Sequence, residues 1–417
     1  MAEEKPGLRR AAGALRYRNY RLFYMALFVA SIGVQIQNTA NLWQVYELTG
    51  SALYLGLTGL ARAIPVIALS LVGGVVADRA DRRRLIALAQ GVAGVTALLL
   101  AALTATGQIA VWHIYAATMV AALMQTLAQP ARTAIIPSLV PRSHLLNALA
   151  LNTTINEMAT IIGPAAAGVA IASVGLVPTY LVNGLAHVIT VSLLLLIQIG
   201  AVVAPPRESP WTSLKAGLRF VRAQSIILVM VGMDAIVNLL GTYRVLLPLF
   251  AAQFGFGAEG LGLLLSAPAV GALLGATGIM ALGNVRYKGL VAAFSLVAYC
   301  GALVVLAWSP WFAVALVACA LLGATDAVQR IARATIIQSV TPDELRGRVA
   351  SVQFTVTAGS PALGQLLSGV AAAALGPSLA LLVGAVACVG FLMLFVASRR
   401  DLRDPDLAMT LEPKVGL

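Results

Sequence analysis

Residues 73–85 read Gly-Gly-Val-Val-Ala-Asp-Arg-Ala-Asp-Arg-Arg-Arg-Leu, and they place a dense cluster of charge between two long apolar stretches. Charges this dense must lie in water or among lipid headgroups, because burying them in hydrocarbon is costly. The stretch therefore predicts a short turn between two membrane helices. Glycines at its membrane end allow two helix backbones to approach closely. By itself, the stretch is also compatible with a cytoplasmic hairpin of any polytopic protein.

The amino-acid composition is typical of a membrane protein. Hydrophobic residues make up 60% of the 417 residues and charged residues 11%, whereas a soluble domain has roughly 25% charged residues. The net charge of +12 would suggest nucleic-acid binding in a soluble protein. Here the positions of the cations explain it, so we expect no nucleic acid. The three cysteines lie within apolar stretches and predict neither a disulfide framework nor a metal site.

Apolar stretches of spanning length, ~20 residues, occur about twelve times along the chain. We predict membrane helices over residues 20–47, 51–77, 84–106, 110–139, 146–173, 178–199, 226–252, 260–283, 289–308, 310–338, 347–374 and 377–397. The basic N-terminal segment precedes a run that is too long for a signal-peptide core, so we expect it to be retained.

Basic residues lie on only one side of this arrangement. The turns after the even-numbered spans and the C-terminal tail contain Lys or Arg. The opposite turns contain neither, and they lie near Thr49, Gly107, Gly175, Gly257, Ser309 and Gly376. By the positive-inside rule both termini are cytoplasmic, and an even number of spans crosses the inner (plasma) membrane of the cell.

The longest hydrophilic connection divides the spans into two sets of six. Within residues 200–225, Leu214, Leu218 and Val221 share one face of a basic helix, which is typical of a helix lying along the inner leaflet. We therefore predict an N-terminal half, a cytoplasmic linker, a C-terminal half and a cytoplasmic tail over residues 1–199, 200–225, 226–398 and 399–417.

An internal repeat supports this division. Residues 131–141, Ala-Arg-Thr-Ala-Ile-Ile-Pro-Ser-Leu-Val-Pro, align without gaps to residues 332–342, Ala-Arg-Ala-Thr-Ile-Ile-Gln-Ser-Val-Thr-Pro, at an offset of 333 − 132 = 201. Both copies fall at the cytoplasmic end of the fourth span of their half. Self-similarity at a distance of about half the chain length indicates a duplicated transporter fold, with chance similarity of two Ala-Ile-rich helix ends as the alternative.

The charged turn also resembles a known family signature. It contains the pattern G-x-x-x-D-R-x-x-R-R at Gly74, Asp78, Arg79, Arg82 and Arg83. This pattern is similar to the loop between helices two and three in the major facilitator superfamily, although that family usually has a second glycine at the position of Asp81. The resemblance covers residues 15–398. It implies an all-α membrane fold of twelve transmembrane helices in two pseudo-symmetric six-helix halves.

Three further stretches narrow the resemblance. Residues 129–152 and 341–351 resemble the enterobactin-exporter-like branch of the drug:proton antiporters. In the fifth span, Gly163, Pro164 and Gly168 are similar to the last part of the antiporter motif of facilitator exporters. Such proteins are single-chain secondary transporters that expel siderophores, macrolides or other amphiphiles. The resemblance therefore implies a monomer in the lipid bilayer that exchanges a small-molecule substrate for protons.

Three acidic residues within the spans are candidates for proton coupling, because a carboxylate in low dielectric can bind and release a proton. Glu157 lies near the middle of the fifth span with no basic residue within a turn, and we favour it; a hydrogen bond between helices is the alternative. Asp234, in the seventh span, is the second candidate. Asp326 has Arg330 four residues later, so that pair can neutralise itself within one helix.

Polar residues predict the lining of the substrate cavity. Gln37, Asn41 and Gln44 recur at helical spacing in the first span and define a polar face, to which we add Asn183 and Asn238. Some drug antiporters place their coupling carboxylate in the first helix, but this chain has no acid there before Glu47, so that mechanism does not transfer directly.

Arginines within the spans have two interpretations. Arg62 and Arg244 either counter an anionic substrate or pair with Glu157 and Asp234. Arg132 and Arg333 occupy equivalent positions of the two repeats, which favours a gate or a scaffold over selectivity.

The leading hypothesis is proton-coupled export of an amphiphilic molecule. Uptake or lipid movement by the same fold is the alternative, because a fold does not determine the direction of transport. A non-transporting receptor or scaffold would not need carboxylates at mid-membrane. The sequence contains no Ser/His, His/Glu or metal-ligand constellation that would predict an enzyme. It also contains no phosphate-binding glycine loop of the kind that predicts a nucleotide-driven pump. We expect no cofactor and no metal.

Overall fold

The computed structural model describes residues 12–69, 81–198, 218–222, 224–283, 288–342 and 345–398. Within these ranges helices are the only regular secondary structure, and eleven helical segments are long and apolar enough to cross a membrane. A twelfth helix, α15 (Arg346–Leu375), has its apolar stretch at Gly359–Leu375. The chain is therefore an all-α, multi-pass membrane protein with the predicted twelve-helix fold.

By the contacts among its residues, the chain divides into two compact units. The first comprises residues 1–44 and 64–207, and the second comprises residues 45–63 and 208–417. These boundaries fall inside two helices, α2 (Arg18–Thr49) and α3 (Ala52–Leu69). The predicted linker, residues 200–225, lies mostly outside the described residues; of its described part, 218–222 is helical and Ser225 begins the helix of the seventh span.

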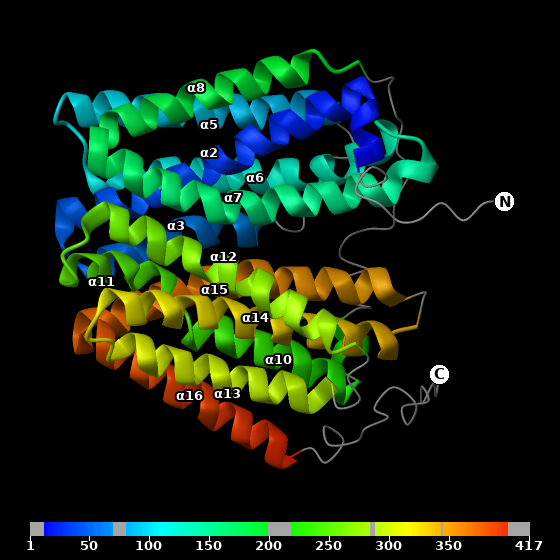
Figure 1. The fold of residues 1–417 in the computed structure, drawn as a ribbon, viewed down its shortest axis with the longest axis vertical. Coiled ribbons are helices and arrows are strands. Elements are labelled where there is room, and N and C mark those ends of the chain that lie inside the picture. Colours follow the sequence, from blue (N-terminus) through cyan, green and yellow to red (C-terminus); the bar gives the residue numbers. More distant parts are fainter. Residues whose placement is uncertain are drawn as a thin grey trace. The chain divides into compact units, whose positions relative to one another are not determined.

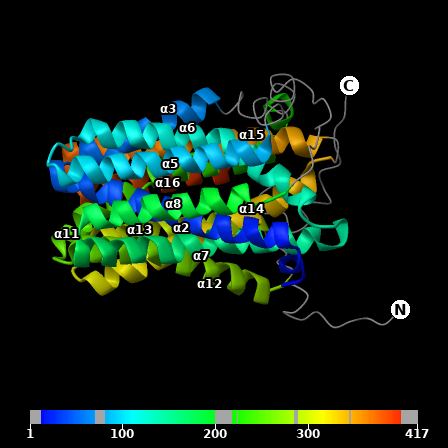
Figure 2. The same cartoon turned by 90° about the horizontal axis from the view of Figure 1, so that it is seen from above.

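Four further helices complete the first unit: α5 (Arg82–Ala105), α6 (Val111–Ile135), α7 (Leu145–Val174) and α8 (Leu176–Leu195). Helix α5 packs against both α6 and α8 (Figures 1 and 2). The approach of α8 to α5 depends on a small residue, because a Cβ at Gly184 would lie 2.6 Å from Cδ2 of Leu98. At one end of the unit Tyr20 is buried in the apolar core and donates a 2.8 Å hydrogen bond to the carbonyl of Ala148.

The second unit is built around α14 (Phe312–Val340), which packs against both α12 (Gly257–Ala281) and α13 (Lys288–Ala307) (Figure 1). A Cβ at Gly271 of α12 would overlap the carbonyl oxygen of Ala320, and one at Gly323 of α14 would overlap that of Pro268. Close backbone contact through small residues is how helices pack where hydrocarbon removes the hydrophobic driving force. Helix α16 (Pro377–Ser398) packs against α13 and α15.

The seventh span is broken, whereas the sequence predicted one continuous helix over 226–252. The structure divides it into α10 (Ser225–Leu240), the short 3₁₀ helix η4 (Arg244–Leu246) and α11 (Leu247–Gln253). Backbone groups at membrane depth need hydrogen-bond partners, and the break has them. The hydroxyl of Tyr299 donates to the carbonyl of Gly241 at 2.9 Å, and Ser368 donates to that of Thr242 at 2.6 Å.

Candidate functional site

The turn motif is only partly within the described residues. Gly74, Asp78 and Arg79 lie outside them. Arg82 and Arg83 form the first turn of α5. Nη1 of Arg82 donates to the carbonyl of Ala134 at 2.9 Å, near the C-terminal end of α6.

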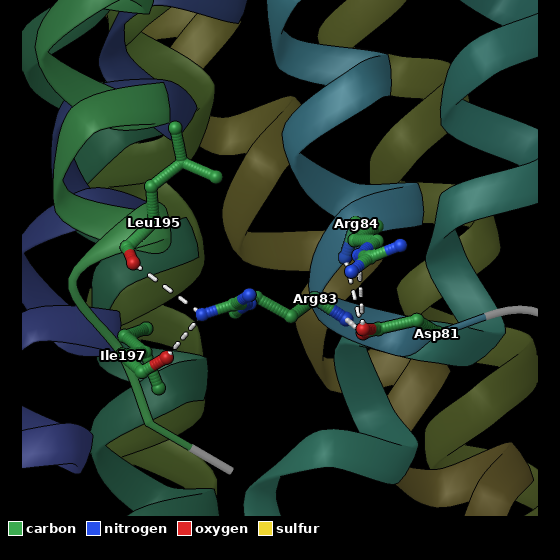
Figure 3. Close-up of polar contacts among 5 residues, drawn as sticks. All are labelled: Asp81, Arg83, Arg84, Leu195 and Ile197. Atoms are coloured by element: carbon green, nitrogen blue, oxygen red, sulfur yellow. Dashed lines mark hydrogen bonds and ion pairs between the residues drawn. The ribbon is translucent and has the colours of Figure 1, made fainter. Parts of the chain in front are cut away.

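Arg83 makes the same kind of contact with a second helix end. Its Nη1 donates to the carbonyls of Leu195 at 3.3 Å and Ile197 at 2.6 Å, where α8 ends (Figure 3). Carbonyls at the end of a helix have no intrahelical partner, and a cation there is favoured by the helix dipole. The two motif arginines therefore hold the ends of α6 and α8 against the start of α5.

Asp81 explains the departure from the family pattern. Its Oδ1 accepts hydrogen bonds from the backbone N–H groups of Arg83 at 3.0 Å and Arg84 at 3.3 Å (Figure 3). Its other oxygen lies 3.5 Å from Nε of Arg84. Aspartate is among the preferred N-cap residues, and glycine is also tolerated there. Asp81 is thus the N-cap of α5, at the position where the family usually has a glycine.

A pocket of about 230 Å³ lies within the first unit. Its lining comes from α2, α6 and α7 and consists of Ser31, Val34, Gln35, Gln125, Gln129, Arg132, Asn156, Ala159 and Thr160. On each helix these residues recur at helical spacing, at 31, 34 and 35 on α2, at 125, 129 and 132 on α6, and at 156, 159 and 160 on α7, so each helix presents a single face to the pocket.

Contacts between α2 and α7 shape one wall of this pocket. Gln35 donates to Oγ1 of Thr160 at 3.1 Å, and Ser31 donates to Oδ1 of Asn156 at 3.5 Å. One turn beyond Thr160, a Cβ at Gly163 would overlap Gln35. This glycine of the antiporter-like motif therefore lets α7 approach α2 closely, and its motif partners Pro164 and Gly168 are buried on the same helix.

Arg132 brings the only positive charge among the residues that line this pocket. Its Nε is buried and has no hydrogen-bond partner among the described residues. On α6 it follows Gln129 by three residues and Gln125 by seven, on the same helical face. The pocket thus combines one guanidinium with the amide groups of four side chains: Gln35, Gln125, Gln129 and Asn156.

Glu157 follows Asn156 on α7 and is half-buried. Within the described ranges its carboxylate forms no ion pair and no hydrogen bond. Glu157 does not line the pocket, although the residue before it, Asn156, does.

The predicted polar face of α2 points into the first unit. Asn183 donates to Gln37 at 2.6 Å, and Gln37 donates to Asn41 at 3.0 Å. Tyr180 is placed 3.1 Å from Asn41 and 2.9 Å from Gln44. These side chains form one internal network, and none of them lines the pocket. Gln44 and Asn183 are only 2% and 1% exposed.

Asp234 is the centre of a buried polar cluster in the second unit. It forms an ion pair with Arg333 of α14 and accepts hydrogen bonds from Thr357 of α15 at 3.1 Å and from Asn238, one turn along α10, at 3.0 Å. Asp234 is 7% exposed and Arg333 is 8% exposed. The expected pairing of Asp234 with Arg244 is wrong, because Arg333 occupies the carboxylate.

Asp326 interacts with the break in the seventh span. Arg244, the first residue of η4, lies within electrostatic range of Asp326, Tyr243 and Tyr299. The expected pair of Asp326 with Arg330 is not formed: Arg330 is exposed and has no ion-pair partner in the described part of the chain. Arg62 is also exposed; it lies on the part of α3 that belongs to the second unit.

Sequence reasoning missed several of these residues. Gln125, Gln129, Thr160 and Thr357 were not among the candidates. The spacing of Gln125, Gln129 and Arg132, at positions i, i+4 and i+7 of an otherwise apolar helix, was a signal that could have identified the pocket wall.

Comparisons with known proteins agree with this architecture. The family described as "Transmembrane secretion effector" matches residues 11–412. The chain is 28% identical over 392 residues to the enterobactin exporter EntS of Salmonella choleraesuis, which covers 90% of this chain and 92% of that protein. It is 29% identical over 405 residues to EntS of Citrobacter koseri, covering 93% and 94%.

Solved structures show the same fold at low identity. The nucleoside transporter NupG superposes with a TM-score of 0.72 at 12% identity, over 91% of this chain and 98% of that one. A bacterial homologue of the human lysosomal transporter Spinster, inward-facing and unoccupied, gives 0.71 at 13% identity, over 95% and 99%.

Fold, length and relatives together define a multi-pass transporter of the major facilitator superfamily, and not an enzyme. Within that superfamily the chain belongs to the transmembrane secretion effector family, as a relative of the enterobactin exporters.

Proposed function

We propose that this transporter exports an amphiphilic organic molecule of the drug or siderophore class in exchange for protons, by alternating access. The observation that carries the proposal is the similarity to enterobactin exporters over 90% of the chain and 92% of the relative. All of the predicted spans lie inside the family match over residues 11–412, so the similarity extends over the whole transmembrane part of the chain.

Glu157 is our candidate for the proton-binding group. Its half-buried carboxylate has no partner in the described part of the chain, and it lies on the helix that forms one wall of the pocket. Asp234 is held by Arg333, and Asp326 interacts with Arg244. Both of these carboxylates already have a basic partner, so Asp234 and Asp326 are the second and third candidates.

The charges in the spans favour neutral or anionic substrates. Away from the two residues at each end of the predicted spans, the sequence has five arginines and three acids, Arg62, Arg132, Arg244, Arg330 and Arg333 against Glu157, Asp234 and Asp326, a difference of 5 − 3 = +2. Asp234 neutralises Arg333, and Asp326 lies within electrostatic range of Arg244. Because Arg62 and Arg330 are exposed, Arg132 is the arginine that remains to act on a substrate. An uncompensated guanidinium in low dielectric repels further positive charge, so permanent dications are expected to be poor substrates.

The proposed topology has both termini in the cytoplasm and the protein acting as a monomer in the cell's inner membrane. Its support is the distribution of Lys and Arg, which are absent from one set of turns and present in the other. On this topology, the capped start of α5 faces the cytoplasm.

Flux into inside-out vesicles tests the proposal. Vesicles containing the protein should accumulate enterobactin or a neutral macrolide when an inward-acidic pH gradient is imposed, and should lose that accumulation when an ionophore removes the gradient. Accumulation that ignores the gradient would rule out proton exchange. Transport confined to lipophilic dications would contradict the proposed substrate class.

A further inference from the structure

We propose that Arg132 and the amides around it form a subsite for an anionic oxygen group of the substrate, a carboxylate or a catecholate. This inference rests on the proposed transport of amphiphiles and names the chemical feature that the first unit recognises. The pocket of about 230 Å³ is smaller than the roughly 300–1,000 Å³ of a site that encloses a drug-sized ligand. It therefore suits one functional group of a larger molecule.

The first argument is that Arg132 has no counter-ion among the described residues. The described residues of the first unit contain two acids, Asp81 and Glu157. Asp81 is used at the start of α5, where it caps the helix and pairs with Arg84. Glu157 forms no ion pair within the described ranges. A guanidinium inside a span is costly unless it is paired or faces a polar cavity, and among the described residues Arg132 has the cavity alone.

The second argument is the comparison with the other repeat. Arg333 occupies the equivalent position, 201 residues later, and is paired with Asp234 inside its own unit. Asp234 lies in the first span of its half, and the first span of the other half, α2, contains no acid over residues 18–44, its part of the first unit. Among the described residues, the first unit therefore keeps the arginine without an acid on the helix that supplies one in the second unit.

The third argument is hydrogen-bond chemistry. The side-chain amides of Gln125 and Gln129 line the pocket without a hydrogen-bond partner among the described residues. Amide N–H groups and a guanidinium are all donors. An anionic oxygen accepts from both, and hydrogen bonds in which one partner is charged are the stronger kind.

Equilibrium binding to the purified full-length protein tests the subsite without a pH gradient. The probes are pyrenebutyrate and its methyl ester, a fluorescent pair of similar size that differs in one charge. The wild-type protein should bind the acid more tightly than the ester. The Arg132→Gln variant should bind the acid roughly ten- to hundred-fold more weakly and the ester within about two-fold of wild type.

A second variant separates charge from structure. Gln129→Glu keeps Arg132 and places a carboxylate three residues before it on the same helical face, where the two can pair. It should weaken binding of the acid as Arg132→Gln does. Arg330→Gln, an exposed arginine of α14, is the matched control and should leave both affinities unchanged.

The inference is overturned if wild type shows no preference for the acid, if Gln129→Glu leaves acid binding unchanged, or if acid and ester lose affinity equally in Arg132→Gln. The vesicle assay distinguishes these outcomes from a failure of the proposed function. If the vesicle assay shows no proton dependence while the binding assay still shows a preference for the acid, proton exchange is refuted and the subsite is retained.

Discussion

Replacing Asp234 by asparagine should strongly destabilise the second unit. Asp234 and Arg333 are 7% and 8% exposed, and removing one partner of a buried ion pair costs roughly 3–5 kcal/mol because the other charge stays buried and unpaired. Asparagine also offers one acceptor oxygen in place of two. Either Thr357 or Asn238 then loses its acceptor, which adds about 1 kcal/mol or more.

A double-mutant cycle identifies the charge as the cause. Arg333→Gln alone should be similarly destabilised, because it leaves Asp234 uncompensated. The double variant contains neither charge and should be more stable than the sum of the single effects implies, with a coupling free energy of about 1–3 kcal/mol. Arg330→Gln is the control, since Arg330 is an exposed arginine on the same helix.

Unfolding of the detergent-solubilised protein is the assay, followed by the fraction that remains monodisperse after heating. The control should have the highest midpoint, and the double variant should unfold above the midpoint that the sum of the two single effects implies. If Asp234→Asn has the same unfolding midpoint as the control, the ion pair does not stabilise the unit. If the two single effects simply add, Asp234 and Arg333 act independently, and the loss of their ion pair is not the cause of the destabilisation.

Three further predictions follow from individual residues. Glu157→Gln should abolish accumulation driven by a pH gradient while sparing substrate binding; Asp234→Asn abolishing it more completely, at matched folded protein, would move the proton site to the second unit. Asp81→Ala should lower stability by about 0.5–2 kcal/mol through loss of the α5 N-cap, and Asp81→Gly by distinctly less; equal unfolding midpoints for the two variants would contradict a capping role. Gly271→Ala should unfold well below wild type, because its Cβ would overlap the backbone of α14, whereas Gly278→Ala on the same helix meets no atom within 4 Å and should be neutral or slightly stabilising; similar midpoints for both alanines would refute the packing argument.

The helices of this fold were predictable because the bilayer imposes their length. Runs of about 20 apolar residues ended within a few residues of the observed helices, as α7 at Leu145–Val174 against a prediction of 146–173 illustrates. The break at η4 was missed because hydropathy sums side chains and takes no account of backbone hydrogen bonds. The interruption begins at Gly241. Its carbonyl accepts a hydrogen bond from the hydroxyl of Tyr299, a residue 58 positions away.

Periodicity predicted which polar residues share a face, and it could not predict what that face meets. Gln37, Asn41 and Gln44 do lie together, yet their partners are Asn183 and Tyr180 inside the unit. A polar stripe on a membrane helix needs partners, whether protein or water. Both solutions give the same spacing, so the sequence alone could not separate an internal network from a cavity wall.

The two arginines of the repeat show how far equivalence in sequence can mislead about function. Their symmetric placement favoured a shared role as gate or scaffold. In the second unit the surroundings support a scaffold, since Asp234 meets Arg333 and Thr357 adds a hydrogen bond from α15. In the first unit the same helix position carries Arg132 beside amides and an open pocket. The cation is present at the repeated position in both units, and among the described residues a counter-ion accompanies it in the second unit alone. Under the proposed subsite, an anionic group of the substrate neutralises Arg132, and it does so only while it is bound.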